Sequence, residues 1–276
     1  MPLITMPREM GTLGKDVAAL VARHMGKAVI HHEIIDPLAD KMRLRKSHVV
    51  RFLEGKAGIL ERMGTDETSL SIFTADEILR LAAAGGAAVI RGWGATHLLA
   101  AVTHVVRVRV CAPFALRADR MMTRLNTADR AFVEKEIQLS DEAVTAISRR
   151  HFDTDWRDAA HYDLIVNTER TSVEDCADAI LSLAGKPRFA ESAQSRVKLA
   201  DLAVAARIRA ELRGNDATRK LDIVADCNEG HVTLSGIVGT DEESTRIADI
   251  AAKAPGVTRV TNQLQSTRRG FRSLEG

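Results

Sequence analysis

The chain has 276 residues, with 39 lysines and arginines against 37 aspartates and glutamates, and its formal net charge is +2. This balance does not call for a nucleic-acid partner, and aromatic residues at 4% are too few for a platform that stacks single-stranded bases. The hydrophobic fraction of 45% is enough to bury a core, and the length suits one mid-sized domain followed by a small one.

The chain opens with the pattern strand, glycine turn, helix. Residues 3–6 form a short apolar run that is typical of a buried strand, and a turn with Gly11 and Gly14 follows. Residues 16–25 then place apolar side chains on one helical face, and Gly26 is expected to end that helix.

Helical and strand patterns alternate over the next part of the chain. Helices are expected over most of 33–83, over 93–101, from Pro113, as a polar pair over 128–151, and over 172–183. Runs rich in valine and isoleucine predict strands at 87–90, 104–111 and 163–167. Strands separated by helices imply an α/β fold with a parallel sheet whose faces are covered.

The apolar periodicity lapses over 185–194, and a separate small unit follows. Its pattern is an amphipathic helix, two strands, a helix and a strand, in the order αββαβ. These elements are expected at 197–212, 221–227, 231–238, 241–254 and 257–264, with residues 228–230 as the hairpin turn and Asp241 as an N-cap. We therefore expect a domain at 1–184, a linker at 185–196, a small domain at 197–267 and a basic tail at 268–276.

The turn between the first strand and the first helix can bind phosphate. Main-chain amides at a helix start point towards an anion, and the helix dipole adds to the attraction. The candidate cofactor-binding residues of this loop are Gly11, Thr12, Leu13, Gly14, Lys15 and Asp16. The match to the standard P-loop is imperfect, because Glu9 stands at the first glycine and Asp16 at the hydroxyl residue that holds magnesium. A simple structural turn is the alternative.

Most of residues 3–183 resembles the cytidylate-kinase-like family, in several segments that follow in the correct order. The opening ITMPREMGTLGKDVAALVARHMG is similar to the family pattern I-T-[IV]-S-R-E-x-G-[ST]-G-G-[RK]-x-[IV]-A, within which Glu9 and Asp16 are expected. The later similar segments are VIRGWGA at 89–95, VRVRVCAP at 106–113 with Arg117, HFDTDW at 151–156 and YDLIVNT at 162–168. Several matched segments are more specific than any one of them.

The resemblance implies a P-loop kinase-like fold and phosphoryl transfer from ATP, with Mg²⁺, to a nucleoside monophosphate such as CMP. The acceptor phosphate is itself the nucleophile, so catalysis rests on positioning and on cations. Lys15, Arg117 and Arg120 are the candidate catalytic residues that this implies, and Arg149 and Arg150, at the end of the presumed lid, are candidate nucleotide-binding residues. Solvated surface charges are the alternative for Arg120, Arg149 and Arg150.

Three positions depart from the family pattern. The arginine of its G-R-G motif is Trp93 here, an expected aspartate is His32, and the lid motif D-x-x-R has Asp141 but Val144. Rescue by Arg91, two residues before Trp93, would need a bend in the strand. Because losing one bidentate arginine–phosphate contact costs a few kcal/mol, these changes can abolish CMP phosphorylation or redirect the acceptor pocket. A nucleotide kinase and a catalytically degenerate nucleotide sensor both remain open.

Residues 198–266 resemble the BON domain. The segments GHVTLSGIV at 230–238 and PGVTRVTN at 255–262 are similar to its patterns G-x-V-x-L-x-G-x-V and P-G-V-x-x-V-x-N, and Gly236 suggests a bulge or a close backbone approach. BON modules are associated with binding membranes or partner proteins, which implies a phospholipid surface or a protein as partner. Basic residues such as Arg259 and Arg272 can attract anionic lipid, and a solvated basic tail is the alternative.

Cysteine usage and the N-terminal residues indicate a cytoplasmic protein. The three cysteines, at 111, 176 and 227, stand far apart, with no metal-ligand spacing and no complete disulfide framework. Arg8 and Glu9 interrupt the N-terminal segment early, and the longest apolar run, 82–90, is too short to cross a bilayer. We expect no transmembrane segment and no metal ion held by protein ligands alone.

Overall fold

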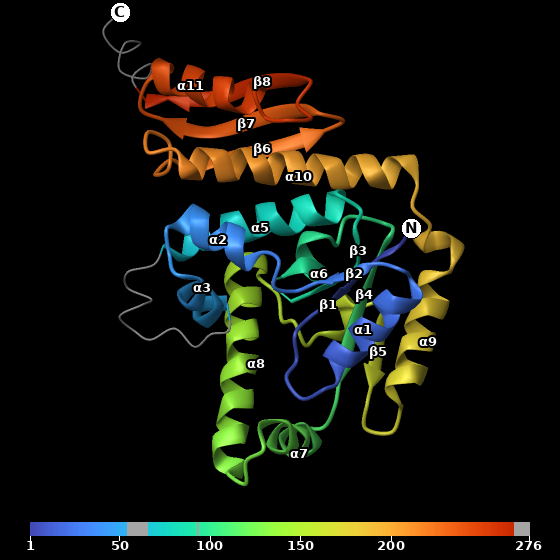
Figure 1. Cartoon of the computed structure of the whole chain (residues 1–276). Helices are drawn as coiled ribbons and strands as arrows, with labels where there is room; N and C mark the ends of the chain where they lie inside the picture. The colour runs from blue at the N-terminus through green and yellow to red at the C-terminus, as the bar shows by residue number, and fades with distance from the viewer. Residues whose placement is uncertain (54–65, 93, 268–276) are drawn as a thin grey trace, which may run out of the picture.

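The computed structural model describes residues 1–53, 66–92 and 94–267. Two units lie one above the other in Figure 1, a larger N-terminal domain around one sheet and a smaller C-terminal unit around another. Every helix in the described ranges is too short or not apolar enough to cross a membrane.

Five parallel strands form the sheet of the N-terminal domain. Their order is β2 (Ala28–Ile30), β3 (Ala87–Arg91), β1 (Leu3–Met6), β4 (Val105–Cys111) and β5 (Leu164–Asn167). Each neighbouring pair is parallel, so every connection crosses over, which confirms the predicted α/β class. The first strand lies at the centre, where the strand order reverses, and ligands of such sheets bind at that point.

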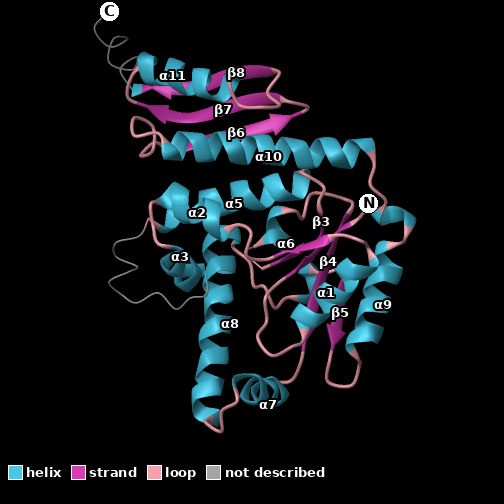
Figure 2. Cartoon of the chain, in the orientation of Figure 1, coloured by secondary structure: helices cyan, strands magenta, loops and turns pink. Residues whose placement is uncertain are grey.

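Helices cover both faces of this sheet (Figure 2). On one face, α1 (Gly14–His24) and α9 (Val173–Ala184) share a core with the central strands. The helices of the other core are α2 (Ile35–Met42), α3 (Lys46–Leu53), α5 (Glu67–Ala83) and α6 (Ala95–Leu98). Two further helices, α7 (Phe114–Leu125) and α8 (Arg130–Phe152), pack against each other through a small apolar cluster beside the sheet.

Some predicted elements differ from the observed ones. The expected helical pair over 128–151 is the single helix α8, because Asp129 caps its start by accepting the Phe132 amide at 2.9 Å and neither glycine nor proline interrupts it. The short helix expected over 93–101 is limited to α6. Asp241 is the first helical residue rather than the N-cap, because Thr240 Oγ1 accepts the Glu243 amide at 3.1 Å.

The C-terminal unit has the predicted αββαβ order. Its elements are α10 (Ala193–Gly214), β6 (Ile223–Asn228), β7 (His231–Val238), α11 (Asp241–Ala252) and β8 (Arg259–Ser266). The hairpin of β6 and β7 turns at Glu229 and Gly230, both at positive φ, and β8 pairs with β7 in parallel. A Cβ on Gly236 would lie 2.7 Å from the Asp222 carbonyl oxygen, which confirms the predicted close backbone approach.

One carboxylate fastens the hairpin turn to α10. Asp201 accepts the amides of Glu229 and Gly230, each at 2.9 Å, and the Cys227 thiol at 3.2 Å. Burial alone would raise the pKa of Asp201, but these donors outweigh it and hold the pKa below its usual value. These bonds therefore tie the turn to the helix.

Helix α10 also packs along α5 of the N-terminal domain (Figure 1). Its residues Leu199, Ala206 and Ala210 belong to the same buried core as the helices on that face of the five-stranded sheet. Arg207 lies 3.2 Å from Asp76 of α5, a carboxylate that is only 2% exposed and that also binds Lys41 of α2 at 2.6 Å. The helix therefore contributes side chains both to this core and to the core of the C-terminal unit.

The shared carboxylate gives a stability prediction. Asp76→Ala removes the buried carboxylate that Lys41 and Arg207 share, although each keeps one other acidic partner, and we expect it to lower the free energy of unfolding by about 2 kcal/mol in urea titrations. Asp36→Ala is the matched control, because Asp36 and its partner Lys46 are both well exposed, and it should cost less than about 0.5 kcal/mol. Equal losses in the two variants would show that Asp76 does not fasten α10.

Candidate phosphate-binding site

The loop between β1 and α1 leaves the central strand at its carboxyl end. Gly11 has a φ of 78° and Leu13, the N-cap of α1, has a φ of 60°. The left-handed region costs a leucine about 1 kcal/mol, so the surroundings must hold it in place. The resembled pattern has glycine at this position, and the backbone has kept the glycine conformation.

Protein donors hold the carbonyl oxygens of this loop from below. The side-chain donors are Thr12 Oγ1 to Glu9 at 2.8 Å, Arg117 Nε to Met10 at 2.6 Å, Arg120 Nη1 to Gly11 at 3.4 Å and Thr168 Oγ1 to Thr12 at 3.0 Å. A trans peptide places its N–H opposite its C=O, so the amides of residues 10–13 face the other way. Within the described part of the chain these four amides donate to no protein acceptor.

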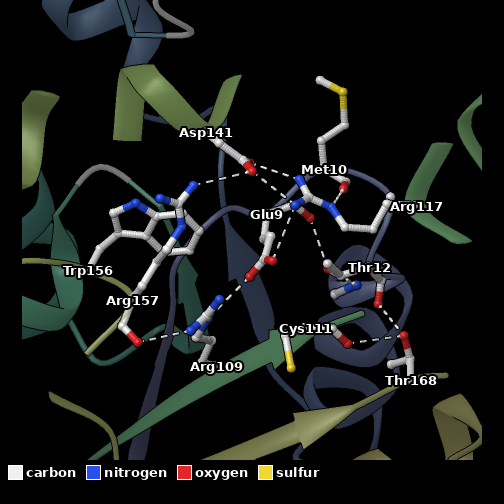
Figure 3. Close-up of polar contacts among 12 residues, drawn as sticks. Glu9, Met10, Thr12, Arg109, Cys111, Arg117, Asp141, Trp156, Arg157 and Thr168 are labelled. Carbon is white, nitrogen blue, oxygen red and sulfur yellow. Dashed lines mark hydrogen bonds and ion pairs between the residues drawn. The ribbon is translucent and has the colours of Figure 1, made fainter. Parts of the chain in front are cut away.

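Arg117 lies beneath the loop and is only 4% exposed. Its two terminal nitrogens bind the Asp141 carboxylate at 2.9 and 2.8 Å, and Nη1 lies 3.4 Å from Glu9 (Figure 3). Because Asp141 belongs to α8 and Met10 to the loop, this guanidinium joins the two. Its contacts are those of a residue that positions the loop, and the predicted catalytic role stays a prediction.

Glu9 is buried under the loop between two guanidinium groups. Its carboxylate lies 3.2 Å from Arg109 and 3.4 Å from Arg117. Burial raises the pKa of Glu9 above its usual value, although both arginines oppose that shift. Arg109 and Arg157 each lie 5.0 Å from the Trp156 ring, at one side of this group (Figure 3).

The remaining candidate residues lie in three places. Arg120 of α7 bonds the Thr168 hydroxyl at 2.9 Å and its carbonyl oxygen at 2.7 Å, beside the loop. Lys15 and Asp16 are exposed on the first turn of α1. Arg149 and Arg150 are exposed at the far end of α8, and Arg150 pairs with Glu67 of α5. Arg150 lies nine positions after Asp141 in the helix, about 13 Å along its axis.

A small cavity of about 40 Å³ opens beside the start of the loop. Pro7, Arg8, Gly92 and Val144 are among its lining residues, so the valine at the lid-motif position contributes apolar surface. His32 is exposed, and Trp93 lies outside the described residues. A larger cavity of about 300 Å³ lies away from the loop, among α3, α5, α8 and α10.

Sequence reasoning missed the role of Thr168. Its hydroxyl bonds both Arg120 and the Thr12 carbonyl oxygen, so it couples the end of β5 to the loop. It is the last residue of the matched segment YDLIVNT, which was the available signal. Thr12 is 156 positions before Thr168 in the sequence, and only the fold brings the two together.

Two glycine variants test how tightly the loop is held. A Cβ on Gly11 would lie 2.6 Å from the Arg117 carbonyl oxygen, whereas one on Gly26 would meet nothing within 4 Å, and both glycines have positive φ. We expect Gly26→Ala to cost about 1 kcal/mol for the backbone alone, and Gly11→Ala about 3 kcal/mol because the loop must also move. Chemical denaturation measures both; equal costs would mean that the loop is not packed on Arg117.

Comparison with family models supports the two resemblances. The model of the cytidylate kinase-like family matches residues 3–170, and the BON domain model matches residues 200–268. These matches confirm the predicted assignments of the N-terminal domain and of a C-terminal BON domain. No curated protein matches the chain in sequence.

Solved structures share the fold at low identity. An uncharacterized protein from Eubacterium ventriosum ATCC 27560 is 18% identical and has a TM-score of 0.52, covering 66% of this chain and 97% of its own. A shikimate kinase from Acinetobacter baumannii in complex with shikimate is 15% identical over 66% of this chain and 92% of its own, with a TM-score of 0.39. The first match shows a common fold, and the TM-score of the second is too low to support a conclusion.

Proposed function

The chain belongs to the cytidylate kinase-like family, and from this membership we propose that its N-terminal domain binds ATP with Mg²⁺ and transfers a phosphoryl group to a nucleoside monophosphate. The observation that supports the proposal most is the set of amides at residues 10–13, which face away from the protein at the start of α1. Amides at a helix N-terminus form a binding site for phosphate oxygens.

In this proposal each loop residue has a defined task. The amides bind the donor phosphates, and the exposed ammonium group of Lys15 offsets the negative charge on them. Arg117 and Arg120 hold the carbonyl oxygens of Met10 and Gly11, so the loop is preorganised before a nucleotide arrives. Both arginines then act mainly as positioning residues.

The magnesium ion would be held mainly by water and by the nucleotide. Thr12 Oγ1 is engaged with the Glu9 carbonyl oxygen, and the exposed Asp16 carboxylate is the oxygen ligand that α1 offers at this point. A hard cation accepts such a carboxylate, directly or through water. When bound, the ion neutralises charge on the transferred group.

A degenerate nucleotide sensor is the second candidate function, and the lid helix favours it. Asp141 of α8 is engaged with Arg117, Val144 lines the small cavity, and Arg150 pairs with Glu67. The cations that a lid brings to the donor phosphates are thus absent from these positions or directed elsewhere. Such a protein would bind ATP through the same loop without turnover.

Nucleotide assays distinguish the two functions. We expect the full chain with ATP, Mg²⁺ and a panel of monophosphates to form ADP with a preferred acceptor. Lys15→Ala should lower kcat/KM about 100-fold, because a charge on the donor phosphates is lost. Lys186→Ala, which changes an exposed lysine beyond α9, is the control and should leave activity unchanged.

The same experiment contradicts the proposal in two ways. ATP binding that Lys15→Ala weakens, without ADP formation from any acceptor, would establish the sensor. Absence of ATP binding, measured by calorimetry on the full chain, would remove both functions, because both depend on the loop.

For the BON domain we propose contact with a phospholipid surface. On the face of its sheet opposite the core, Ile237 is 64% exposed and Val224 is 49% exposed. Val224 pairs with Ser235, so Ile237 is its diagonal neighbour on the same face. Arg259 lies on this face too, because it pairs with His231, two strand repeats before Ser235. Exposed apolar side chains at one end of this face and a cation at its other end, about 20 Å along the strand, suit an anionic membrane surface.

Vesicle sedimentation tests this contact. The full chain should pellet with phosphatidylglycerol-containing vesicles at low salt, and Ile237→Ser should reduce the pelleted fraction several-fold. Val197→Ser, at a 40% exposed valine of α10, is the matched control and should have no effect. No pelleting, or equal effects of the two variants, would remove the proposed lipid contact.

A further inference from the structure

Arg91 is a buried arginine at the carboxyl end of β3. It pairs with Met6 of the central strand, and the next amide, of Gly92, donates to the Met6 carbonyl oxygen at 2.7 Å. Residues i and i+2 of a strand share a face, so Arg91 lies on the side of Val89, which packs with Val17 of α1. Its guanidinium is therefore at the sheet edge beside the first turn of α1, and the residue is only 7% exposed.

Within the part of the chain that the structure describes, Arg91 differs from Arg117 and Arg109 in having no ion-paired carboxylate. Arg117 and Arg109 each lie within 3.4 Å of a carboxylate. Among the described residues Arg91 forms no ion pair, and its buried Nε has no hydrogen-bond partner. Burying an unpaired charge is costly, and an unsatisfied buried donor adds to that cost. A fold keeps such a group where another molecule supplies the missing acceptor.

The surroundings of Arg91 are electropositive. Burial, together with the charges of Arg8 and Arg124, lowers the pKa of Arg91 to about 10, while Asp16 acts in the opposite direction. Burial, followed by the charge of Arg91, lowers the pKa of His31 to about 4, so that imidazole is neutral at physiological pH. In the described ranges, Asp16 acts on Arg91 through its charge and not through an ion pair. The helix dipole of α1 adds positive potential at the same place.

We propose that Arg91 binds an oxyanion group of the acceptor substrate, a phosphate or a carboxylate, at the carboxyl end of β3. The evidence for an oxyanion site is the buried, unpaired guanidinium. The assignment of this site to the acceptor rests on the proposed phosphoryl transfer. The site lies one strand from the loop that faces the donor phosphates, because β3 neighbours β1. A planar guanidinium offers two parallel N–H donors to such a group.

Nuclear magnetic resonance of arginine Nε–H groups tests the site without any turnover. The ¹⁵N-labelled full chain is titrated with inorganic phosphate, with CMP and with succinate at constant ionic strength, and the Arg91 signal is assigned by its loss in Arg91→Lys. We expect a saturable shift of that signal. A shift with phosphate and CMP identifies a phosphate site, and a shift with succinate alone identifies a carboxylate site. No shift with any of the three overturns the proposal.

Arg91→Met provides a second, independent readout. Removing an unpaired buried charge should raise Tm by about 2–4 °C, whereas Arg109→Met, which removes a paired one, should lower it. For CMP we expect at least 10-fold weaker binding in Arg91→Met, with ATP binding unchanged. A fall in Tm in both variants, with CMP binding retained, would mean that Arg91 is structural.

These results separate the oxyanion site from the proposed function. If oxyanions shift the Arg91 signal in a protein that transfers no phosphoryl group, the oxyanion site is supported and the kinase activity is contradicted. If Lys15→Ala abolishes turnover and Arg91→Met leaves it unchanged, the kinase activity is supported and the oxyanion site is contradicted.

Discussion

The arrangement of the N-terminal domain depends on how the carbonyl oxygens of one loop are held. Each is bonded from beneath, by Thr12, Arg117, Arg120 or Thr168, so the planar peptides present their amides to the outside. The donors come from α7 and from the end of β5 as well as from the loop itself. A short segment with a leucine at positive φ is thereby kept in a conformation that glycine would adopt more easily.

The buried charges of this domain divide into two kinds. One is a closed network in which Glu9 and Asp141 neutralise Arg109 and Arg117 below the loop. The other is the single guanidinium of Arg91, which no carboxylate neutralises among the described residues. Paired charges of this kind specify a geometry, whereas an unpaired one leaves electrostatic potential available to a ligand. The network lies around the loop that follows β1, whereas Arg91 lies on β3, the strand beside β1.

Local patterns predicted the elements and the loop, because strand alternation, glycine turns and helix ends are properties of a few adjacent residues. The long helix α8 was predicted as a pair, since a polar surface helix carries weak periodicity. The site was predicted in part. Residues 11–16 follow from their place between a strand and a helix, but the partners of Arg117 are 24 and 108 positions away from it. Sequence spacing does not contain such contacts, and neither does it show that Arg150 turns towards Glu67.

Helix α10 follows the N-terminal domain in the sequence, but its side chains belong to the cores of both units. The helix begins at Ala193, buries Leu199 and Ala206 against the larger domain and Ile208 and Leu212 against the smaller sheet. A protein shortened to residue 192 would therefore expose an apolar surface of α5 and is prone to self-association. The larger domain therefore depends on a helix of the smaller unit to close one of its cores, whereas the core of the smaller unit is built from its own residues.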